Sequence, residues 1–402
     1  MDWTRLELSF DIAMEGELFS AERDTERTMS CGLENGTLDF SLLFDFGGKP
    51  PLHLRGAAAV GDRARIRLLP WRIELYVADR LVDEEWPRGR HFLPDSVLRD
   101  NGCGLRLEPA RLSHAPESAV LGEFQNAQGW RPEENVFVGD CMPFSYQGQY
   151  HILYLRDRHH HRSKWGLGAH QWSHISSEDF VNWKIHPMAV EIDDPEEGSI
   201  CTGSWIWNEG IHYLYYTVRT CDGSPASIRR SVSEDGYHFR KDRDFRVLLS
   251  GKYTGSSARD PKVIRGADDL FHMILTTSLT DGPGCLAHLV SRNLNRWEEL
   301  PQPIYIAPAD MWEPECPDYF YKDGYYYLVF SLRGKGHYLY STEPFSGWRE
   351  PGNPIIPCKT VPKAALWQNR LIFAGFDCID QYGGTLTFTE ARVQPEGELE
   401  FL

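Results

Sequence analysis

The chain has 402 residues, and its 58 acidic and 42 basic side chains give a formal net charge of −16. Nucleic-acid binding depends on clustered Lys and Arg, so this balance argues against a nucleic-acid partner. A hydrophobic fraction of 41% and an aromatic fraction of 13% are typical of a folded globular protein. The length exceeds that of one ordinary core and predicts one large and one smaller domain.

Residues 1–10 show no basic segment followed by an apolar run, and no stretch approaches the roughly 18 apolar residues of a membrane span. We therefore expect neither a signal peptide nor a membrane partner. The nine cysteines are scattered without a CxxC or another metal-ligand spacing. This pattern predicts reduced, mostly buried thiols in a cytoplasmic protein that needs no cofactor or metal.

Residues 1–112 alternate apolar and polar side chains in short runs, for example from Leu38 to Phe44, and turn residues such as Asn35-Gly36 separate the runs. A period of two without a convincing helical segment predicts a smaller, β-sandwich-like N-terminal domain. No set of titratable groups converges in this segment. We therefore expect a packing or oligomerisation role for it, and the sequence leaves open whether the chain forms a homo-oligomer.

Residues 113–402 contain a recurring unit. In its first copy, Phe137–Trp183, an acidic residue precedes a glycine turn, an alternating strand, a second strand and a closing Trp. Further copies follow turn residues at Gly210, Asp269, Gly324 and Asn369. Several strands in a repeat of this length are typical of a β-propeller, in which each unit buries its faces against its neighbours. The whole chain is thus predicted to be all-β, with a five-bladed propeller after the smaller domain.

Three acids precede the turn residues of their own repeats at nearly the same distance. Asp140 lies 8 residues before its turn, and Asp260 and Glu315 each lie 9 before theirs. They should fall on the first strand of their blades, which lines the central channel of a propeller, and converge at one mouth. Gathered carboxylates repel one another and raise the pKa of at least one of them. Glycoside cleavage uses such a pair, one protonated and one ionised.

A structural interpretation competes with this one, because Asp and Glu beside Pro or Gly commonly act as turn or cap residues. For any one acid alone the two interpretations are comparable. The second and fifth repeats have no acid at this position; Cys201-Thr202 and Thr360-Val361 occupy it instead. The acids are therefore not part of the structural code of the repeat, which favours a functional role.

The motifs around these acids resemble those of family 32 glycoside hydrolases, the invertases, inulinases and levanases. The likeness covers roughly residues 135–395. Its elements are the opening acid Asp140, Arg259-Asp260-Pro261, Glu315-Cys316-Pro317-Asp318, Trp165-Gly166, His170-Gln171-Trp172-Ser173-His174, Asp179-Phe180-Val181-Asn182-Trp183 and Thr202-Gly203-Ser204.

The resemblance implies that Asp140 is the nucleophile, Glu315 the acid/base and Asp260 the stabiliser of the transition state. Arg259 would hold a sugar hydroxyl or Glu315. For Cys316 two interpretations stay open, a thiol that tunes the pKa of the neighbouring acid and an inert buried thiol. The family fold, a five-bladed propeller with a β-sandwich, agrees with the repeat count.

We expect the remaining substrate contacts from Trp165, His170, Trp172 and Ser204, with core packing as the alternative for the two tryptophans. A metal site is a further interpretation of the histidines at 159–161, 170 and 174. Consecutive histidines point in different directions, whereas zinc needs defined ligand spacing. A rim that bonds sugar hydroxyls is therefore favoured over a metal.

This chain departs from the family pattern in three places. Gly139-Asp140-Cys141-Met142 replaces the Asn-Asp-Pro-Asn-Gly of the family, and the sandwich-like segment precedes the propeller instead of following it. The histidine loop at 159–161 has no counterpart in the pattern.

The leading hypothesis is a retaining hydrolase that cleaves terminal β-fructofuranosyl linkages of sucrose or short fructans. Two alternatives are enzymes, an inverting pentosidase of family 43 and a phosphorylase on the same fold, and a third is a non-catalytic sugar-binding propeller. A separation of about 5–5.5 Å between the carboxylates indicates retention and ~6.5–9.5 Å indicates inversion. A phosphorylase would need a cluster of basic residues beside the site.

Overall fold

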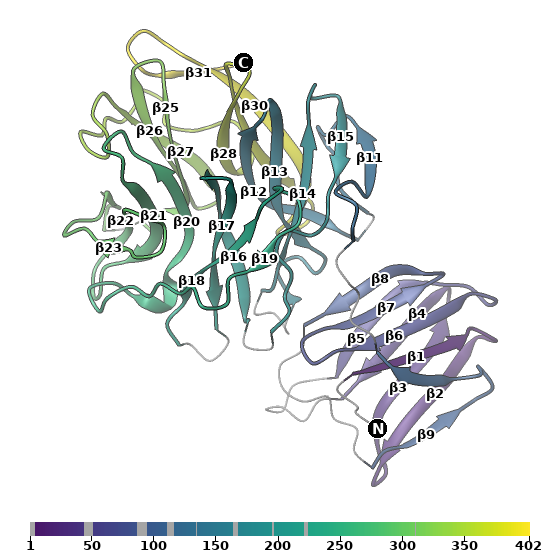
Figure 1. Cartoon of the computed structure of the whole chain (residues 1–402). Helices are drawn as coiled ribbons and strands as arrows, with labels where there is room; N and C mark the ends of the chain where they lie inside the picture. Colours follow the sequence, from purple (N-terminus) through teal and green to yellow (C-terminus); the bar gives the residue numbers. More distant parts are fainter. Residues whose placement is uncertain are drawn as a thin grey trace. The chain divides into compact units, whose positions relative to one another are not determined.

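The computed structural model describes residues 5–43, 51–86, 95–110, 116–133, 135–163, 168–194, 197–220, 224–309 and 311–402. β-Strands make up almost all of its regular structure (Figure 1), and a short 3₁₀ helix spans Gly255–Ser257. The chain divides into two compact units. One comprises Met1–His114, His161–Ala169 and Ile192–Glu197, and the other Ala115–His160, His170–Glu191 and Gly198–Leu402. Within the described ranges, no helix is long and apolar enough for a membrane span.

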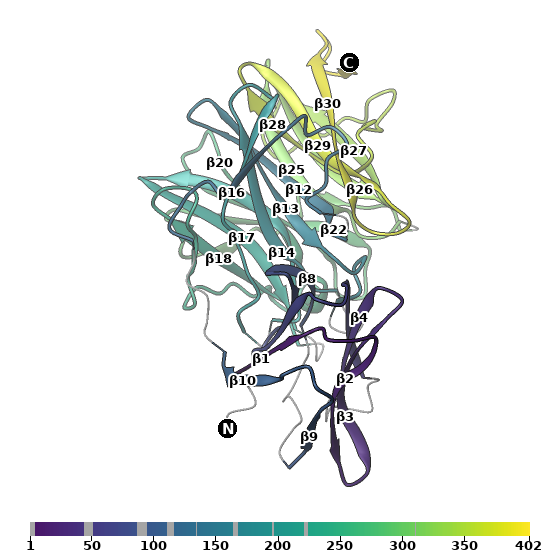
Figure 2. The ribbon, with the colours of Figure 1, turned by 90° about the vertical axis from the view of Figure 1, so that its right-hand side faces the viewer.

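Two antiparallel five-stranded sheets form the N-terminal unit, with strand orders β10-β1-β6-β7-β8 and β5-β4-β3-β2-β9. Figure 2 shows β1, β8 and β10 on one side of this unit and β2, β3, β4 and β9 on the other. The strands are β1 (Leu6–Asp11), β2 (Gly16–Arg23), β3 (Glu26–Glu34), β4 (Thr37–Leu42), β5 (Leu52–Ala57), β6 (Arg63–Leu68), β7 (Ile73–Val77), β8 (Arg80–Glu85), β9 (Val97–Asp100) and β10 (Arg106–Pro109).

One apolar core lies between these two sheets. Along β1 and β4 every second side chain is buried, as the period of two predicted. Leu8 and Phe10 from one sheet and Phe19 and Phe40 from the other belong to the same cluster.

The second unit consists of successive antiparallel meanders. The first meander contains β11 (Gly122–Gln125), β12 (Phe137–Tyr146), β13 (Gln149–Asp157), β14 (Gln171–Ser177) and β15 (Asn182–Ile185). The second contains β16 (Ser199–Asn208), β17 (Ile211–Arg219), β18 (Ser227–Ser233) and β19 (Arg240–Lys241), and the third contains β20 (Arg259–Arg265), β21 (Phe271–Ser278), β22 (Gly284–Ser291), β23 (Glu298–Glu299) and β24 (Tyr305–Ile306). The fourth contains β25 (Glu315–Lys322), β26 (Tyr325–Leu332) and β27 (Lys335–Ser341), and the fifth contains β28 (Thr360–Trp367), β29 (Arg370–Cys378), β30 (Gly384–Val393) and β31 (Leu399–Phe401). The first and last meanders join where Val138 pairs with Gly384.

The meanders follow one another around the second unit in chain order (Figure 1). Their first strands contact each other in a closed cycle, β12 with β16, β16 with β20, β20 with β25, β25 with β28 and β28 with β12. The turns after three of these strands contain Gly148, Gly210 and Gly324 with φ of 81°, 86° and 95°, a conformation that glycine tolerates best. The repeat read from the sequence therefore corresponds to these sheets.

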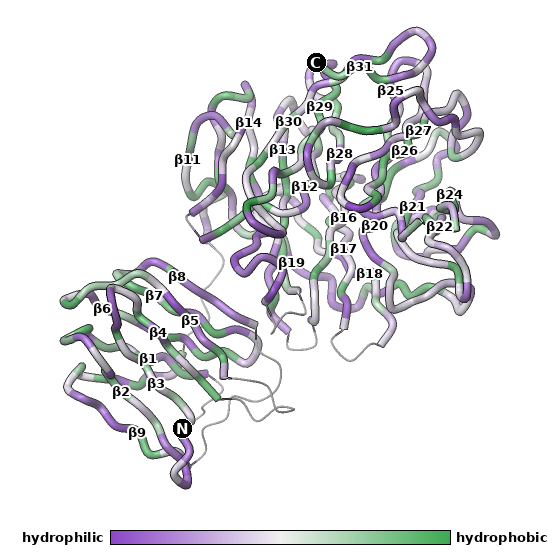
Figure 3. The backbone as a smooth tube through the Cα atoms, turned by 180° about the vertical axis from the view of Figure 1, so that it is seen from behind, coloured by the Kyte–Doolittle hydropathy of each residue, from purple (hydrophilic) through white to green (hydrophobic). Residues whose placement is uncertain are grey.

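Apolar side chains fill the space between adjacent sheets. Ile206 and Tyr215 of the second meander share a cluster with Met273 and Leu275 of the third. Figure 3 shows the apolar and polar segments alternating along the strands. Neighbouring meanders thus bury one another's faces, which fixes the position of each first strand.

Every first strand carries an irregularity at the same place. The register against the second strand shifts between Val138 and Cys141 in β12, and equivalent shifts occur in β16, β20, β25 and β28. A β-bulge leaves residues unpaired and redirects their side chains. Asp260, Cys316 and Val361 begin three of these bulges with φ of 58°, 52° and 48°, in the left-handed region that non-glycine residues seldom adopt.

Candidate active site

The three predicted acids lie at these bulges on first strands, as expected. Their register positions differ, however. Glu315 pairs with Ser331 as the last residue before its bulge, Asp260 is the first unpaired residue of its bulge, and Asp140 is the second. The expectation of one shared position was therefore wrong by one or two residues. Asp140 lies one residue closer to its turn than Asp260 does, and the stretch from bulge to turn is one residue shorter in β25 than in β12 and β20.

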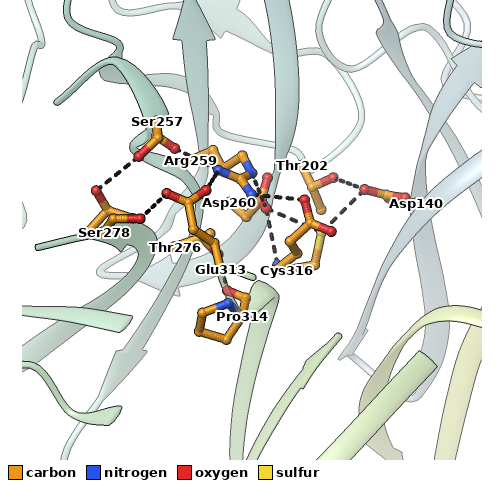
Figure 4. A network of polar contacts seen from close by, with 12 residues as sticks. Asp140, Thr202, Ser257, Arg259, Asp260, Thr276, Ser278, Glu313, Pro314 and Cys316 are labelled. Atoms are coloured by element: carbon orange, nitrogen blue, oxygen red, sulfur yellow. Dashed lines mark hydrogen bonds and ion pairs between the residues drawn. The ribbon is translucent and has the colours of Figure 1, made fainter. Parts of the chain in front are cut away.

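Contacts link the acids into one cluster (Figure 4). The Cys316 thiol lies 3.3 Å from Oδ2 of Asp140 and 3.3 Å from Oδ2 of Asp260. On the other side, Arg259 donates to Oε1 of Glu315 at 2.8 Å and its Nε lies 3.6 Å from Oδ2 of Asp260. The structure thus brings all three predicted acids together.

Asp140 is buried and held through both of its oxygens. Oδ2 accepts a hydrogen bond from Thr202 Oγ1 at 2.5 Å, and Oδ1 accepts one from the Tyr382 hydroxyl at 3.0 Å. The same hydroxyl accepts the backbone N–H of Asp140 at 3.1 Å. A Cβ on Gly139 would stand 2.5 Å from this hydroxyl, so the close approach requires glycine. The carboxylate therefore has a fixed orientation, as a nucleophile requires.

Asp260 is 3% exposed, and its Oδ2 accepts the backbone N–H of Cys316 at 3.1 Å. Burial raises its pKa to about 6; the Arg259 charge opposes this shift and the nearby Asp140 carboxylate adds to it. The sequence predicted a raised pKa from mutual repulsion. The raised pKa is present, but loss of solvation is its main cause.

Arg259 contacts three carboxylates. In addition to Asp260 and Glu315, it donates from Nη1 to Oε2 of Glu313 at 2.6 Å. Burial disfavours its charge, but these carboxylates more than offset that effect and raise its pKa above the ordinary value. Glu313 also accepts a hydrogen bond from Ser278 Oγ at 2.5 Å. Although burial opposes it, the charge of Arg259 lowers the pKa of Glu313 and keeps it ionised.

The side chain of Glu315 is 37% exposed, whereas those of Arg259 and Asp260 are 10% and 4% exposed. It is thus the most open member of the cluster. A proton donor must reach the leaving oxygen of a bound substrate, and this position allows such an approach.

The Cys316 thiol is not isolated from the charged groups. Burial raises its pKa well above the usual value, and the charges of Asp140 and Asp260 raise it further. The thiol stays protonated, and the two carboxylates share its single S–H as a hydrogen-bond donor. Its hydrogen-bond contacts are with the predicted nucleophile and stabiliser, whereas the sequence suggested an effect on Glu315.

Two further predicted residues are buried supports. Trp172 has no exposed surface, and its Nε1 donates to the Cys201 carbonyl at 3.1 Å, in keeping with the core-packing alternative. His170 Nε2 lies 3.4 Å from Asp157 Oδ1, and its ring packs 5.3 Å from that of Tyr382.

Ser204 connects two first strands. Its hydroxyl donates to the Pro261 carbonyl at 2.8 Å and accepts the N–H of Val263 at 2.9 Å. This contact fixes β16 against β20 next to Asp260. Trp165 lies outside the described residues.

Sequence reasoning missed four residues that contact the acids or their strands. Thr202 occupies in β16 the bulge position that Asp140 occupies in β12. Lys363 follows the bulge of β28 and donates to the Gly203 carbonyl at 3.1 Å. The pair of acids in Glu313-Pro314-Glu315 was a signal for Glu313, but nothing in the sequence pointed to Tyr382, 242 residues from Asp140.

A cavity of about 720 Å³ lies beyond the bulges along the same first strands. It is lined by Met142–Tyr146, Gly203–Trp207, Lys262–Ala267, Asp318–Phe320 and Lys363–Leu366, together with aromatic residues such as Phe345. Every one of these first-strand segments follows its bulge. The acids precede them, so this cavity is separate from the acid cluster.

Comparisons with known proteins agree with this geometry. Over 226 residues the chain is 29% identical to sucrose-6-phosphate hydrolase of Escherichia coli, a match that covers 53% of this chain and 43% of that protein. The chain therefore spans less than half the length of this relative.

Among solved structures, it resembles a variant of fructan 1-exohydrolase IIa from Cichorium intybus in complex with 1-kestose. That match has a TM-score of 0.58, 16% identity and coverage of 69% of this chain and 60% of that one. It also resembles a GH43_1 enzyme from Xanthomonas citri, with a TM-score of 0.52, 13% identity and coverage of 66% and 91%. At these identities the likenesses show a shared all-β fold.

Residues 124–347 match the N-terminal domain of the glycosyl hydrolases of family 32. This match includes the three acids, Thr202 and Arg259. Because it spans more than half of the chain, the chain belongs to glycosyl hydrolase family 32.

Proposed function

We propose that this protein is a retaining glycoside hydrolase that cleaves terminal β-fructofuranosyl linkages of sucrose or short fructans. The observation that carries the proposal is the continuous cluster in which Cys316 joins Asp140 to Asp260 and Arg259 joins Asp260 to Glu315. Membership of family 32 and the 1-kestose complex of a structural relative support a fructoside as the substrate.

The proposed architecture is a five-bladed propeller in residues 113–402 preceded by a β-sandwich in residues 1–112. The closed cycle of contacts among β12, β16, β20, β25 and β28 supports the propeller. The two facing sheets of the N-terminal unit support the sandwich. In the proposed propeller, the acids at the bulges would lie at one mouth of the central channel.

In the proposed reaction, Asp140 attacks the anomeric carbon while Glu315 gives its proton to the leaving oxygen. The bond to the leaving group breaks as a covalent fructosyl ester forms on Asp140. Glu315 then takes a proton from water, which displaces the ester and releases fructose. Asp260 accepts hydrogen bonds from sugar hydroxyls, which strengthen as positive charge develops on the ring.

The described cysteines are free thiols, including the buried Cys141, Cys316 and Cys358. A reducing compartment preserves such thiols, which supports a cytoplasmic location as part of the proposal.

The direct test replaces each acid by its isosteric amide. Asp140→Asn and Glu315→Gln should each lower turnover of sucrose by several orders of magnitude, on the scale of losing a nucleophile or general acid. Circular dichroism and thermal melting should show an intact fold. Near-normal activity in either folded variant would reject the assignment.

The anomer of the first-formed product separates the enzyme alternatives. NMR of fresh hydrolysate should show β-fructofuranose, the retained configuration. The inverted anomer would instead establish the single-displacement mechanism.

A further inference from the structure

Three buried histidines gather in the first sheet of the second unit, apart from the acids. His151 lies on β13, His174 on β14, and His186 directly follows β15. They are 3%, 0% and 4% exposed, and one ring nitrogen from each lies within 4.8 Å of those of the others. Nδ1 of His151 and Nε2 of His174 are 3.0 Å apart.

Burial opposes protonation of all three rings. Burial lowers the pKa of His151 to about 3 and that of His186 to about 4, and it lowers that of His174 well below its usual value. A neutral imidazole offers one lone pair, which is the form that binds zinc.

Backbone groups orient two of the rings as they do in metal sites. His186 Nδ1 lies 2.6 Å from the Ala119 carbonyl, so this nitrogen carries the proton, and Nε2 accepts a hydrogen bond from Ser176 Oγ at 2.8 Å that zinc would replace. The ring of His151 bonds to the backbone of Tyr146. A ring N–H fixed by a carbonyl is the usual support of a zinc-binding histidine.

The third sheet offers an internal comparison. His272 and His288 there occupy the same register positions as His151 and His174, and Nδ1 of the first lies 2.9 Å from Nε2 of the second. A histidine pair is therefore compatible with the repeat alone. The counterpart of His186 in that sheet is Leu300, since each donates its backbone N–H to the second histidine's carbonyl. The third histidine is thus an addition specific to the first sheet.

From these contacts we propose that His151, His174 and His186 bind one Zn²⁺ ion that ties three strands of the first sheet together. Tetrahedral zinc with bonds of about 2.0–2.1 Å places its ligand nitrogens roughly 3.3 Å apart. The nitrogens of His151 and His174, at 3.0 Å, are already near this separation. A water molecule would fill the fourth position.

The test measures zinc in the full-length protein. After dialysis against a weak chelator, or after unfolding with a chelator and refolding with Zn²⁺, mass spectrometry for metals should find about one zinc per chain. Added Zn²⁺ should raise the melting temperature of the refolded protein. Co²⁺ in its place should give the intense visible absorption of a tetrahedral site.

The matched variants are His186→Leu and His288→Leu. The first introduces the residue found in the third sheet and should fold, lose the bound zinc and lose the zinc-dependent rise in melting temperature. The second removes the comparison pair and should keep one zinc.

The loop at 159–161 is a rival source of zinc ligands, and replacing its three histidines by alanine should leave the zinc in place. The proposal is overturned if wild-type protein refolded with Zn²⁺ retains no zinc. It is also overturned if folded His186→Leu keeps one zinc per chain, or if the loop variant alone loses it.

Discussion

The Tyr382 hydroxyl bonds twice to the same residue, accepting from the backbone N–H of Asp140 and donating to its carboxylate. Thr202 holds the second oxygen from the neighbouring second meander. An attacking carboxylate must face the anomeric carbon along one direction, and these contacts remove its freedom to rotate. Gly139 keeps the space in which the tyrosine fits.

Removing this hydroxyl should weaken catalysis without unfolding the protein. A hydrogen bond to a charged group contributes about 1.5–3 kcal/mol, so Tyr382→Phe should lower kcat by roughly 10- to 100-fold. Because orientation is lost and not substrate contact, KM should change much less. Tyr321→Phe, at a half-exposed tyrosine of β25, is the control and should behave as wild type. An unchanged kcat for Tyr382→Phe would contradict the positioning role.

The raised pKa of Asp260 predicts how stability depends on pH. Its folded pKa of about 6 lies above its unfolded value of 3.8, so ionisation opposes folding. This penalty is absent below the unfolded pKa, grows as pH rises toward 6 and is complete above it. Asp260→Asn removes the penalty. The variant should therefore gain stability relative to wild type at pH 7.5, by a few kcal/mol at most, and less at pH 4.5.

Thermal melting at several pH values measures this difference. Asp281→Asn, at an exposed turn, provides the control and should show no such trend. A difference between Asp260→Asn and wild type that does not vary with pH would show that burial does not shift this carboxyl. The gain in stability should accompany a loss of activity, as expected where a site retains an unfavourable charge for function.

At the scale of strands and sheets, the bulges explain why part of the site was predictable. Hydrophobic alternation and the turn glycines located the first strands, and an acid on such a strand could be assigned to the centre of the unit. The inserted residue in each strand has no sequence signature, since Asp260, Cys316 and Val361 share a left-handed backbone without sharing a residue type. The order of the acids along the strands therefore had to come from the structure.

Contacts between sheets were the least predictable features. Ser204 is the last residue of the Thr202-Gly203-Ser204 motif, from which we expected a sugar contact. The Ser204 hydroxyl instead joins β16 to β20. Trp172 packs in the core next to Gly203, where only a residue without a side chain fits. The local sequence does not reveal these contacts, because the partners of Ser204 lie on β20 and the partner of Trp172, Gly203, lies on β16.

The whole molecule carries a net charge of −16, which bears on its substrate. The basic groups around the acids are already engaged: Arg259 by carboxylates, Lys262 by Asp318 at 2.5 Å, and Lys363 by the Gly203 carbonyl. Anionic substrates meet a repulsive field at such a surface. We therefore propose an uncharged fructoside rather than a phosphorylated one as the substrate, although the E. coli relative is a sucrose-6-phosphate hydrolase.

At low ionic strength, kcat/KM for sucrose should exceed that for sucrose 6-phosphate by roughly tenfold. Added salt should narrow the gap, since it screens exposed charges beyond about 10 Å. Steady-state kinetics with both substrates at two salt concentrations measure this. Preference for the phosphate ester at low salt would mean that basic groups beyond those described here recognise the phosphate.

Trapping the proposed covalent bond between Asp140 and the sugar tests the mechanism most directly. In Glu315→Ala, a fructosyl donor with fluoride as leaving group needs no proton for departure, while water lacks the base that would release the sugar. Peptide mass spectrometry after a short reaction should find one fructosyl group, on Asp140. An unlabelled protein that still releases fructose, or a label on another residue, would contradict the account.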